Sequence, residues 1–168
     1  MDQAARETTV LSETALAAPS GTQLRPQLAK LLHWYSHLSP ETLSDIGNFY
    51  DATASFKDPF NTVQNREGIT AVFQHMFKML ETPVFIIREQ MLDGEQVFIT
   101  WDFQFRKGGK DFLLHGGSYL RFNASGKVIQ HRDYWDSAEE LLHKLPLIGP
   151  PLRLLRRMLS VRDESGTQ

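Results

Sequence analysis

The sequence predicts an α+β fold in which three helices are followed by a bent antiparallel sheet. Up to about residue 80 the apolar residues recur with helical spacing, whereas from residue 84 onward they alternate with a period of two. Short turns join the alternating segments, and such turns favour antiparallel pairing of consecutive strands. Because the helices come first and the strands afterwards, the expected class is α+β.

Three helices are expected before the sheet. The first spans about residues 26–37, where leucines recur every three or four positions. The second begins at Ser39-Pro40-Glu41, which combines a capping residue, a proline suited to the first turn and an acid at the positive end of the helix dipole. The third covers residues 66–80 with one broad apolar stripe, and Pro83 ends it.

The strands are bounded by turn residues. A short strand over residues 54–57 lies between the second and third helices and stops at Asp58-Pro59. Gly116-Gly117 lies inside a later strand, where a glycine pair indicates a bulge or a sharp bend. A sheet bent there would wrap around the three helices. Four long strands are predicted, over residues 84–91, 95–106, 111–122 and 127–135.

The composition fits one folded domain and excludes several functions. Of the 168 residues, 41% are hydrophobic and 23% are charged, as is typical of globular chains. The formal net charge of −2 provides no basic field, so we expect no nucleic-acid partner. The absence of cysteine excludes disulfides, thiolate metal sites and cysteine nucleophiles, and it fits a reducing compartment, so we expect a cytoplasmic protein. Neither a metal site nor a cofactor is expected.

Three regions are expected along the chain. Residues 1–25 are rich in Ala, Thr, Ser and Gln and predict a disordered tail, with a short helix over Val10–Ala18 as the alternative. Residues 26–140 form the folded domain. Residues 141–168 form a basic C-terminal extension, in which Leu152–Leu159 predicts an amphipathic helix. That helix is suited to an anionic membrane surface, to the mouth of a pocket or to a partner subunit.

The strand over residues 95–106 has one apolar face and one mixed face that includes Thr100 and Asp102. If the helices cover the mixed face, Asp102 points into a partly polar interior. The apolar face then needs another cover, most simply a second subunit, so we expect a homodimer through the outer face of the sheet. The apolar face consists of Val97, Ile99, Trp101, Phe103 and Phe105.

The last strand carries an aspartate in an unusual setting. Asp133 shares a strand face with His131 and Trp135, and it belongs to the ending Arg-Asp-Tyr-aromatic-Asp. With the three helices, the Asp-Pro pair and the glycine bend, this ending resembles the SnoaL-like branch of the nuclear transport factor 2 superfamily over about residues 26–140. The ending is similar to the matching segment of limonene epoxide hydrolases, and ketosteroid isomerases and polyketide cyclases share the fold.

This resemblance implies a cone-shaped bent sheet, a deep apolar pocket and dimerisation through the outer sheet face. It also implies three candidate catalytic residues. Asp133 matches the water-activating aspartate of the epoxide hydrolases, and Asp102 matches the aspartate that donates to the epoxide oxygen. Asp58 matches the proton-shuttling aspartate of the isomerases.

Several positions depart from these relatives. The arginine that bridges the two carboxylates of the hydrolases falls at Thr100, and their water-holding tyrosine and asparagine fall at Phe56 and Asp58. The oxyanion-hole aspartate of the isomerases falls at Ser118, and their oxyanion-hole tyrosine falls at one of two aromatic residues of the first helix. The residues that we expect to line the pocket and bind a ligand are Trp34, Tyr35, Phe56, Phe73, Phe77, Thr100, Ser118, His131 and Trp135.

Without a bridging arginine, close carboxylates in an apolar pocket raise one another's pKa. A neutral carboxylic acid beside an ionised one is an acid–base pair. The expected function is therefore binding of a small apolar molecule, with proton transfer as in a cofactor-independent isomerase, cyclase or hydrolase. The alternatives are a ligand-binding or protein-interaction module of the same fold, in which Asp133 pairs with an arginine and Asp58 caps the turn before Pro59.

Overall fold

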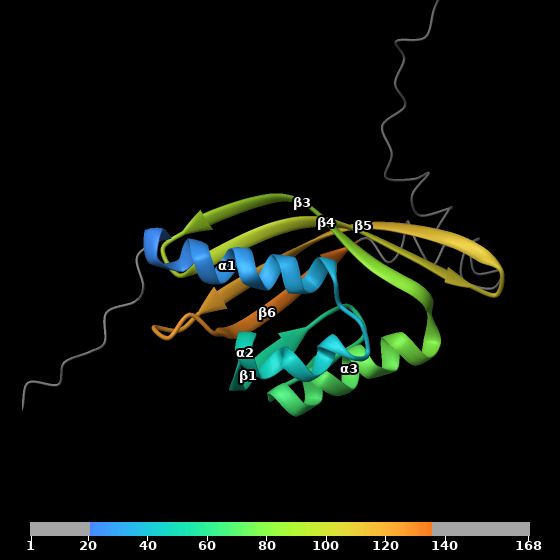
Figure 1. Cartoon of the computed structure of the whole chain (residues 1–168), viewed down its shortest axis with the longest axis horizontal. Helices are drawn as coiled ribbons and strands as arrows, with labels where there is room; N and C mark the ends of the chain where they lie inside the picture. The colour runs from blue at the N-terminus through green and yellow to red at the C-terminus, as the bar shows by residue number, and fades with distance from the viewer. Residues whose placement is uncertain (1–20, 136–168) are drawn as a thin grey trace, which may run out of the picture.

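The computed structural model describes residues 21–135, which form a curved, unclosed six-stranded sheet with helices packed on it (Figure 1). The predicted α+β class is confirmed. The helical elements are α1 (Gly21–Ser36), the 3-10 helix η1 (Thr42–Asp45), the short α2 (Ile46–Phe49) and α3 (Arg66–Met79). The strands are β1 (Tyr50–Lys57), β2 (Thr62–Val63), β3 (Glu81–Asp93), β4 (Gln96–Lys107), β5 (Lys110–Phe122) and β6 (Val128–Trp135).

The helices begin where local sequence and burial favour them. The first helix starts at Gly21, five residues before its predicted start, and Leu24 in this extra turn is buried in the core. Asn65 caps α3 by accepting a hydrogen bond from the Gly68 backbone amide at 2.7 Å. Residues 1–20 of the predicted tail, residues 136–140 at the end of the predicted domain and the whole predicted C-terminal extension, residues 141–168, lie outside the described residues.

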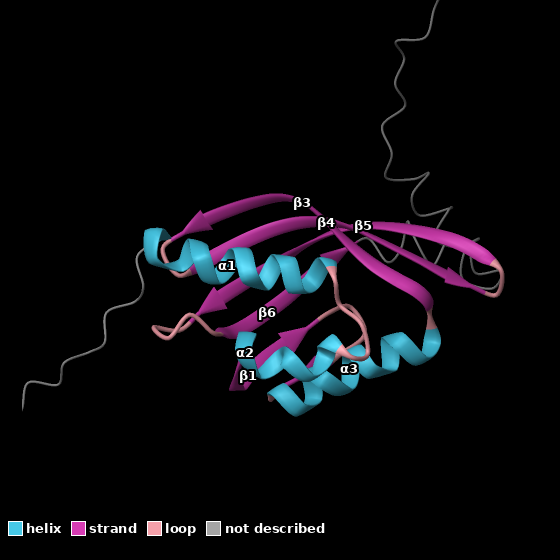
Figure 2. Cartoon of the chain, in the orientation of Figure 1, coloured by secondary structure: helices cyan, strands magenta, loops and turns pink. Residues whose placement is uncertain are grey.

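The sheet is mixed and not purely antiparallel as predicted. Its strand order is β2-β1-β6-β5-β4-β3, and β1 runs parallel to β6. The chain between β1 and β6 contains α3 and four strands, which is long enough for the crossover that parallel pairing requires. Figure 2 shows the short loops at the strand ends and the helices packed beside the strands. This pairing places the first strand of the domain next to its last.

The glycine pair in β5 does not form the predicted bulge. The β4–β5 register continues without a shift through Trp101↔Gly116 and Thr100↔Gly117. A Cβ atom at Gly116 would overlap the Trp101 indole, and one at Gly117 would lie 2.7 Å from Cζ of Phe98. The two glycines therefore make room for aromatic rings on the neighbouring strand.

The apolar face of β4 points inward, and the predicted assignment of its two faces is wrong. All five residues of that face are at most 8% exposed and belong to the core, together with Leu28 and Leu31 of α1 and Ile69 and Phe73 of α3. The helices cover the more apolar face because this arrangement removes more apolar surface from water. Asp102 and Thr100 consequently lie on the outer face of the sheet.

In the described part of the chain, no helix has both the length and the hydropathy needed to cross a membrane.

Candidate functional site

A cavity of about 310 Å³ lies between α3 and the inner face of the sheet. We call it the central cavity. Its walls are mainly apolar side chains from β1, α3, β3, β4 and β5, and Asp133 and Trp135 of β6 complete them. The principal wall residues are Phe56, Val72, Phe73, Met76, Phe85, Trp101, Phe103 and Leu114.

The central cavity continues into a narrow inner end. This inner end is lined by Tyr35, Ser118 and His131, and it shares Asp133 and Trp101 with the central cavity. Its volume of about 10 Å³ is at the lower limit of the space that holds one water molecule. Asp133 is the polar side chain that lines both spaces, and the other polar side chains of the central cavity are Asp58, Asn61, His75 and Lys107.

Strand alternation places Asp133 in this position. Ser118 of β5 is paired directly with Asp133 of β6, so both side chains lie on the inner face. The Asp133 side chain is 15% exposed and the His131 side chain is 3% exposed. Asp133 therefore combines access from the cavity with polar neighbours deep in the core.

Asp133 is held by hydrogen bonds that converge on one of its oxygens. The Ser118 hydroxyl donates to Oδ1 at 2.5 Å, and Nε2 of His131 lies 2.7 Å from the same oxygen. The Trp101 indole N–H donates to the Ser118 hydroxyl at 2.9 Å. Among the described residues, none hydrogen-bonds to Oδ2, so this oxygen is the one that can accept from a ligand.

Two buried tyrosines complete the network behind His131. The Tyr50 hydroxyl lies 2.6 Å from Nδ1 of His131 and the Tyr35 hydroxyl 3.1 Å from it, and the two hydroxyls also hydrogen-bond to each other. Burial raises the pKa of both phenols well above the usual range, and the nearby Asp133 carboxylate adds to the rise. Both tyrosines therefore stay protonated and act as hydrogen-bond donors.

The neutral tyrosines determine the arrangement of protons that we assign to the network. A phenol that donates to Nδ1 leaves the proton of a neutral His131 on Nε2, from which it is donated to Asp133. All donors then point from the core toward the carboxylate. An ionised carboxylate, which only accepts hydrogen bonds, satisfies this arrangement.

Asp58 lies at the edge of the central cavity but serves a different purpose. Its carboxylate accepts hydrogen bonds from the backbone amide of Phe60 at 2.7 Å and from the side-chain amide of Asn61 at 2.9 Å. These contacts cap the turn that follows β1, as in the alternative interpretation of this residue. Its carboxylate is thus occupied by the loop.

Asp102 does not face the cavity, which corrects the prediction that it shares a site with Asp133. Its side chain lies on the outer face of the sheet, where Arg88 donates from Nε at 2.7 Å and Nδ1 of His115 lies 2.6 Å away. The hydrogen bonds from Arg88, and secondly from His115, hold the pKa of the Asp102 carboxyl below its usual range. The expected rise in the pKa of this group through repulsion between carboxylates is therefore wrong.

The structure divides the remaining predicted ligand-binding residues into two groups. Residues that line the central cavity or its inner end are Tyr35, Phe56, Phe73, Ser118, His131 and Trp135. Trp34, Phe77 and Thr100 line neither space. The Trp34 indole donates to the Thr42 carbonyl at 2.8 Å, Phe77 packs on the core, and the Thr100 hydroxyl accepts from the Glu89 backbone amide at 3.2 Å.

Sequence reasoning missed Tyr50, Phe85 and Trp101. Tyr50 precedes the predicted start of its strand by four residues. It is an even number of residues from Ala54 and Phe56, so extending the predicted strand back to Tyr50 would have placed its side chain on the same, buried face. Trp101 was assigned to the outer face with the rest of its apolar stripe.

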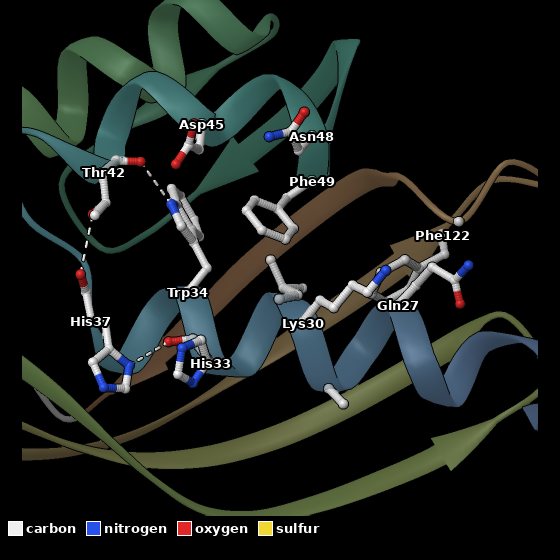
Figure 3. Close-up of a pocket in the computed structure, with 13 residues that line it drawn as sticks. Gln27, Lys30, His33, Trp34, His37, Thr42, Asp45, Asn48, Phe49 and Phe122 are labelled. Atoms are coloured by element: carbon white, nitrogen blue, oxygen red, sulfur yellow. Dashed lines mark hydrogen bonds between the residues drawn. The ribbon is translucent and has the colours of Figure 1, made fainter.

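A second, more open groove runs along α1, opposite η1 and α2 (Figure 3). Its volume is about 810 Å³, and Trp34 and Phe49 form part of its floor. The polar side chains around it, such as Lys30, Asp45 and Asn48, are exposed. Although this groove is larger than the central cavity, it has no buried titratable group comparable to Asp133.

Within residues 21–135 no three His, Asp or Glu side chains are grouped as metal ligands would be.

The comparison with known families agrees with this geometry. Residues 31–131, more than half of the chain, match the model of the SnoaL-like domain. The chain belongs to this family, whose fold is that of a small-molecule pocket protein. No curated protein matches the sequence.

Solved structures show the same fold at low sequence identity. A putative SnoaL-like polyketide cyclase from Jannaschia sp. CCS1 is 14% identical, with a TM-score of 0.63, over 80% of this chain and 97% of that one. A protein with a ketosteroid isomerase-like fold from Catenulispora acidiphila DSM 44928, solved with trimethylamine, is 18% identical, with a TM-score of 0.59, over 66% and 88%. A putative isomerase of the SnoaL-like family from Agrobacterium tumefaciens str. C58 is 15% identical, with a TM-score of 0.56, over 68% and 98%.

Proposed function

We propose that the protein binds a small, mostly apolar molecule in the central cavity and that Asp133 accepts a proton from it. One observation carries this proposal: a carboxylate lies where an apolar cavity narrows, with one oxygen fixed by His131 and Ser118. A base needs a fixed position within reach of the proton it removes. The apolar walls would supply most of the binding energy, and the carboxylate would orient the ligand.

Asp133 would act without Asp102 or Asp58. The first lies on the other face of the sheet, and the second caps a turn. In an isomerase or cyclase, Asp133 would take a proton from one atom of the ligand and return it to another. In a hydrolase, Asp133 would take a proton from a water molecule whose oxygen attacks the ligand, and the proton would then pass to the group that leaves. No cofactor is needed for these steps.

Binding can be tested with 2-tetralone, an uncharged bicyclic ketone with acidic C–H groups. Saturation-transfer NMR should detect its binding to the wild-type protein. Val72→Trp, which fills the wall of the central cavity, should abolish the signal. Ala71→Trp, an exposed position next to it on α3, should preserve the signal. Equal binding by both variants would place the ligand outside the cavity.

Proton transfer can be followed in the same samples. In D₂O, the wild-type protein should accelerate exchange of the acidic C–H protons over buffer alone, and Asp133→Asn should remove the acceleration. Binding without accelerated exchange would favour the second candidate, a ligand-binding module without catalysis. One observation favours that candidate: the donors at the inner end already have acceptors in the protein, so none is ready to stabilise an enolate.

We also propose a cytoplasmic homodimer that associates through the outer face of the sheet. Four apolar side chains on that face are at least 40% exposed: Val84, Met91, Leu113 and Tyr134. An apolar surface of this kind is suited to association. Leu113→Glu should lower the mass measured by light scattering toward that of one chain, whereas Gln74→Glu, which adds the same charge at an exposed position of α3, should leave it higher.

The proposed membrane contact of the basic C-terminal segment concerns residues outside the described part. Liposome co-sedimentation of the full chain, compared with a chain ending at Lys144, tests it. Equal and negligible binding by both would exclude it.

A further inference from the structure

The hydrogen bonds at the inner end of the central cavity all have the same direction. Trp101 donates to Ser118 at 2.9 Å, and Ser118 donates to Asp133 at 2.5 Å. On the other side, the buried phenol of Tyr50 lies 2.6 Å from His131, which in turn lies 2.7 Å from Asp133. Both branches end on Oδ1 of Asp133, so the donors among the described residues of the inner end are already in use.

The group left for a ligand is therefore an acceptor. It is Oδ2 of a carboxylate that is 15% exposed. The walls around it are aromatic, since Phe56, Phe73, Phe85 and Trp101 line the same space. The faces of aromatic rings carry partial negative charge and attract cations and N–H groups. The carboxylate and its walls thus favour the same kind of ligand group.

We propose that the central cavity selects ligands whose buried end is a hydrogen-bond donor, above all a protonated amine, and disfavours ligands whose buried end is an anion. This inference rests on the proposed function, because it concerns the ligand of the same cavity. A buried anion would meet the Asp133 carboxylate without a free donor, and both the repulsion and the lost hydration weaken its binding.

Charged groups at the edge of the cavity do not reverse this preference. Lys107 and His75 line the outer part and are exposed to solvent. The backbone of Lys107 is six residues from Trp101 along β4, about 20 Å of extended strand. Asp58, also at the edge, carries the same sign of charge as Asp133. The positive charge of Lys107 therefore lies at the outer part, whereas the inner end presents a carboxylate.

Three probes with one ring system test the inference by isothermal titration calorimetry at pH 7. They are 2-naphthylmethylamine, 2-naphthylmethanol and 2-naphthoate, which place a cation, a neutral donor and an anion on the same naphthalene. In the wild-type protein the amine should bind at least about tenfold more tightly than the carboxylate, with the alcohol between them. A tenfold ratio corresponds to about 1.4 kcal/mol.

Two variants then locate the origin of this order. Asp133→Asn keeps the size of the side chain and removes its charge, so it should weaken amine binding about tenfold and reduce the ratio between amine and carboxylate to below about threefold. Asp93→Asn removes the same charge at an exposed position of β3 and should leave the order unchanged.

The wild-type order is decisive even if a variant fails to fold. Carboxylate binding as tight as that of the amine would overturn the inference and leave the proposed cavity function intact. An unchanged order in a folded Asp133→Asn protein would have the same effect. If none of the three probes binds the wild-type protein, the proposed function falls together with the inference.

Discussion

The paired hydroxyls of Tyr35 and Tyr50 should replace each other at His131, and removing both should cost more than the sum of the single losses. In Tyr50→Phe, the Tyr35 hydroxyl, 3.1 Å from Nδ1, can take over as donor. In Tyr35→Phe, the Tyr50 hydroxyl keeps its 2.6 Å contact. Each single variant then loses about one net hydrogen bond, which lowers the free energy of unfolding by ~1 kcal/mol.

The double variant leaves Nδ1 of His131 buried and unpaired. An unsatisfied buried acceptor adds a further ~1–3 kcal/mol, so the total loss should be ~3–5 kcal/mol. The interaction energy between the two sites, obtained from a double-mutant cycle, should therefore be ~1–3 kcal/mol. Urea unfolding followed by circular dichroism measures it. With a slope of ~2 kcal/mol per molar urea, each single variant shifts the midpoint by ~0.5 M.

Tyr119→Phe is the matched control, because the Tyr119 hydroxyl donates to Gln96 at 3.0 Å near the surface and should contribute less than ~0.5 kcal/mol. Additive losses from the two core tyrosines, within ~0.5 kcal/mol, would refute the reasoning. That result would mean that the phenols do not share His131 as an acceptor.

Three other predictions follow from features of the sheet and its loops. Gly116→Ala should destabilise the protein by ~1–3 kcal/mol in the same urea assay, since its Cβ would overlap the Trp101 indole; Gly94→Ala, where no atom lies within 4 Å, should show only the smaller cost of its positive φ. Because the pKa of the Asp102 carboxyl is lowered in the folded state, its ionised form stabilises the fold at pH values above the ordinary carboxyl pKa, and this contribution is lost as the pH falls through the lowered pKa. Asp102→Asn should therefore reduce the loss of stability that occurs below pH 4. An unchanged dependence of stability on acid pH would contradict this. Asp58→Ala should lower stability by ~1 kcal/mol through loss of its turn hydrogen bonds, whereas Asp58→Asn should retain part of them; equal losses in thermal unfolding would count against the capping role.

The sequence was sufficient to predict the main elements of the fold, but it was insufficient to predict the short strand β2 and the pairing of β1 with β6. The alternation from residue 84 onward predicts the four long strands because one of their faces is buried. The parallel pairing of β1 with β6 has no local signal, since the two strands lie more than 70 residues apart. The two-residue strand β2 is too short to show any periodicity.

The candidate site shows the same limit. Strand parity correctly placed His131 and Asp133 on one face, and the family resemblance assigned Ser118 to the same pocket, where the structure pairs it with Asp133. Parity cannot tell which face the helices cover. The inward position of Trp101 and the outward position of Asp102 follow from the helices covering the more apolar face.

The partners of Asp133 also depend on distant segments. Tyr35 comes from α1 and Tyr50 from the start of β1, and both reach His131 only after β6 has joined β1. Nothing in the local sequence of β6 indicates these contacts, because they depend on how the helices pack.

The position of Asp133 in the last described strand has a consequence for how the protein matures in the cell. A chain emerging from the ribosome presents α1, α3 and most of the sheet before β6 is available, and the central cavity at that stage lacks its carboxylate. β6 pairs with both β5 and β1, so the sheet and the hydrogen-bond network are complete only when this strand is present. A chain that ends before β6 therefore lacks the carboxylate on which the proposed function depends.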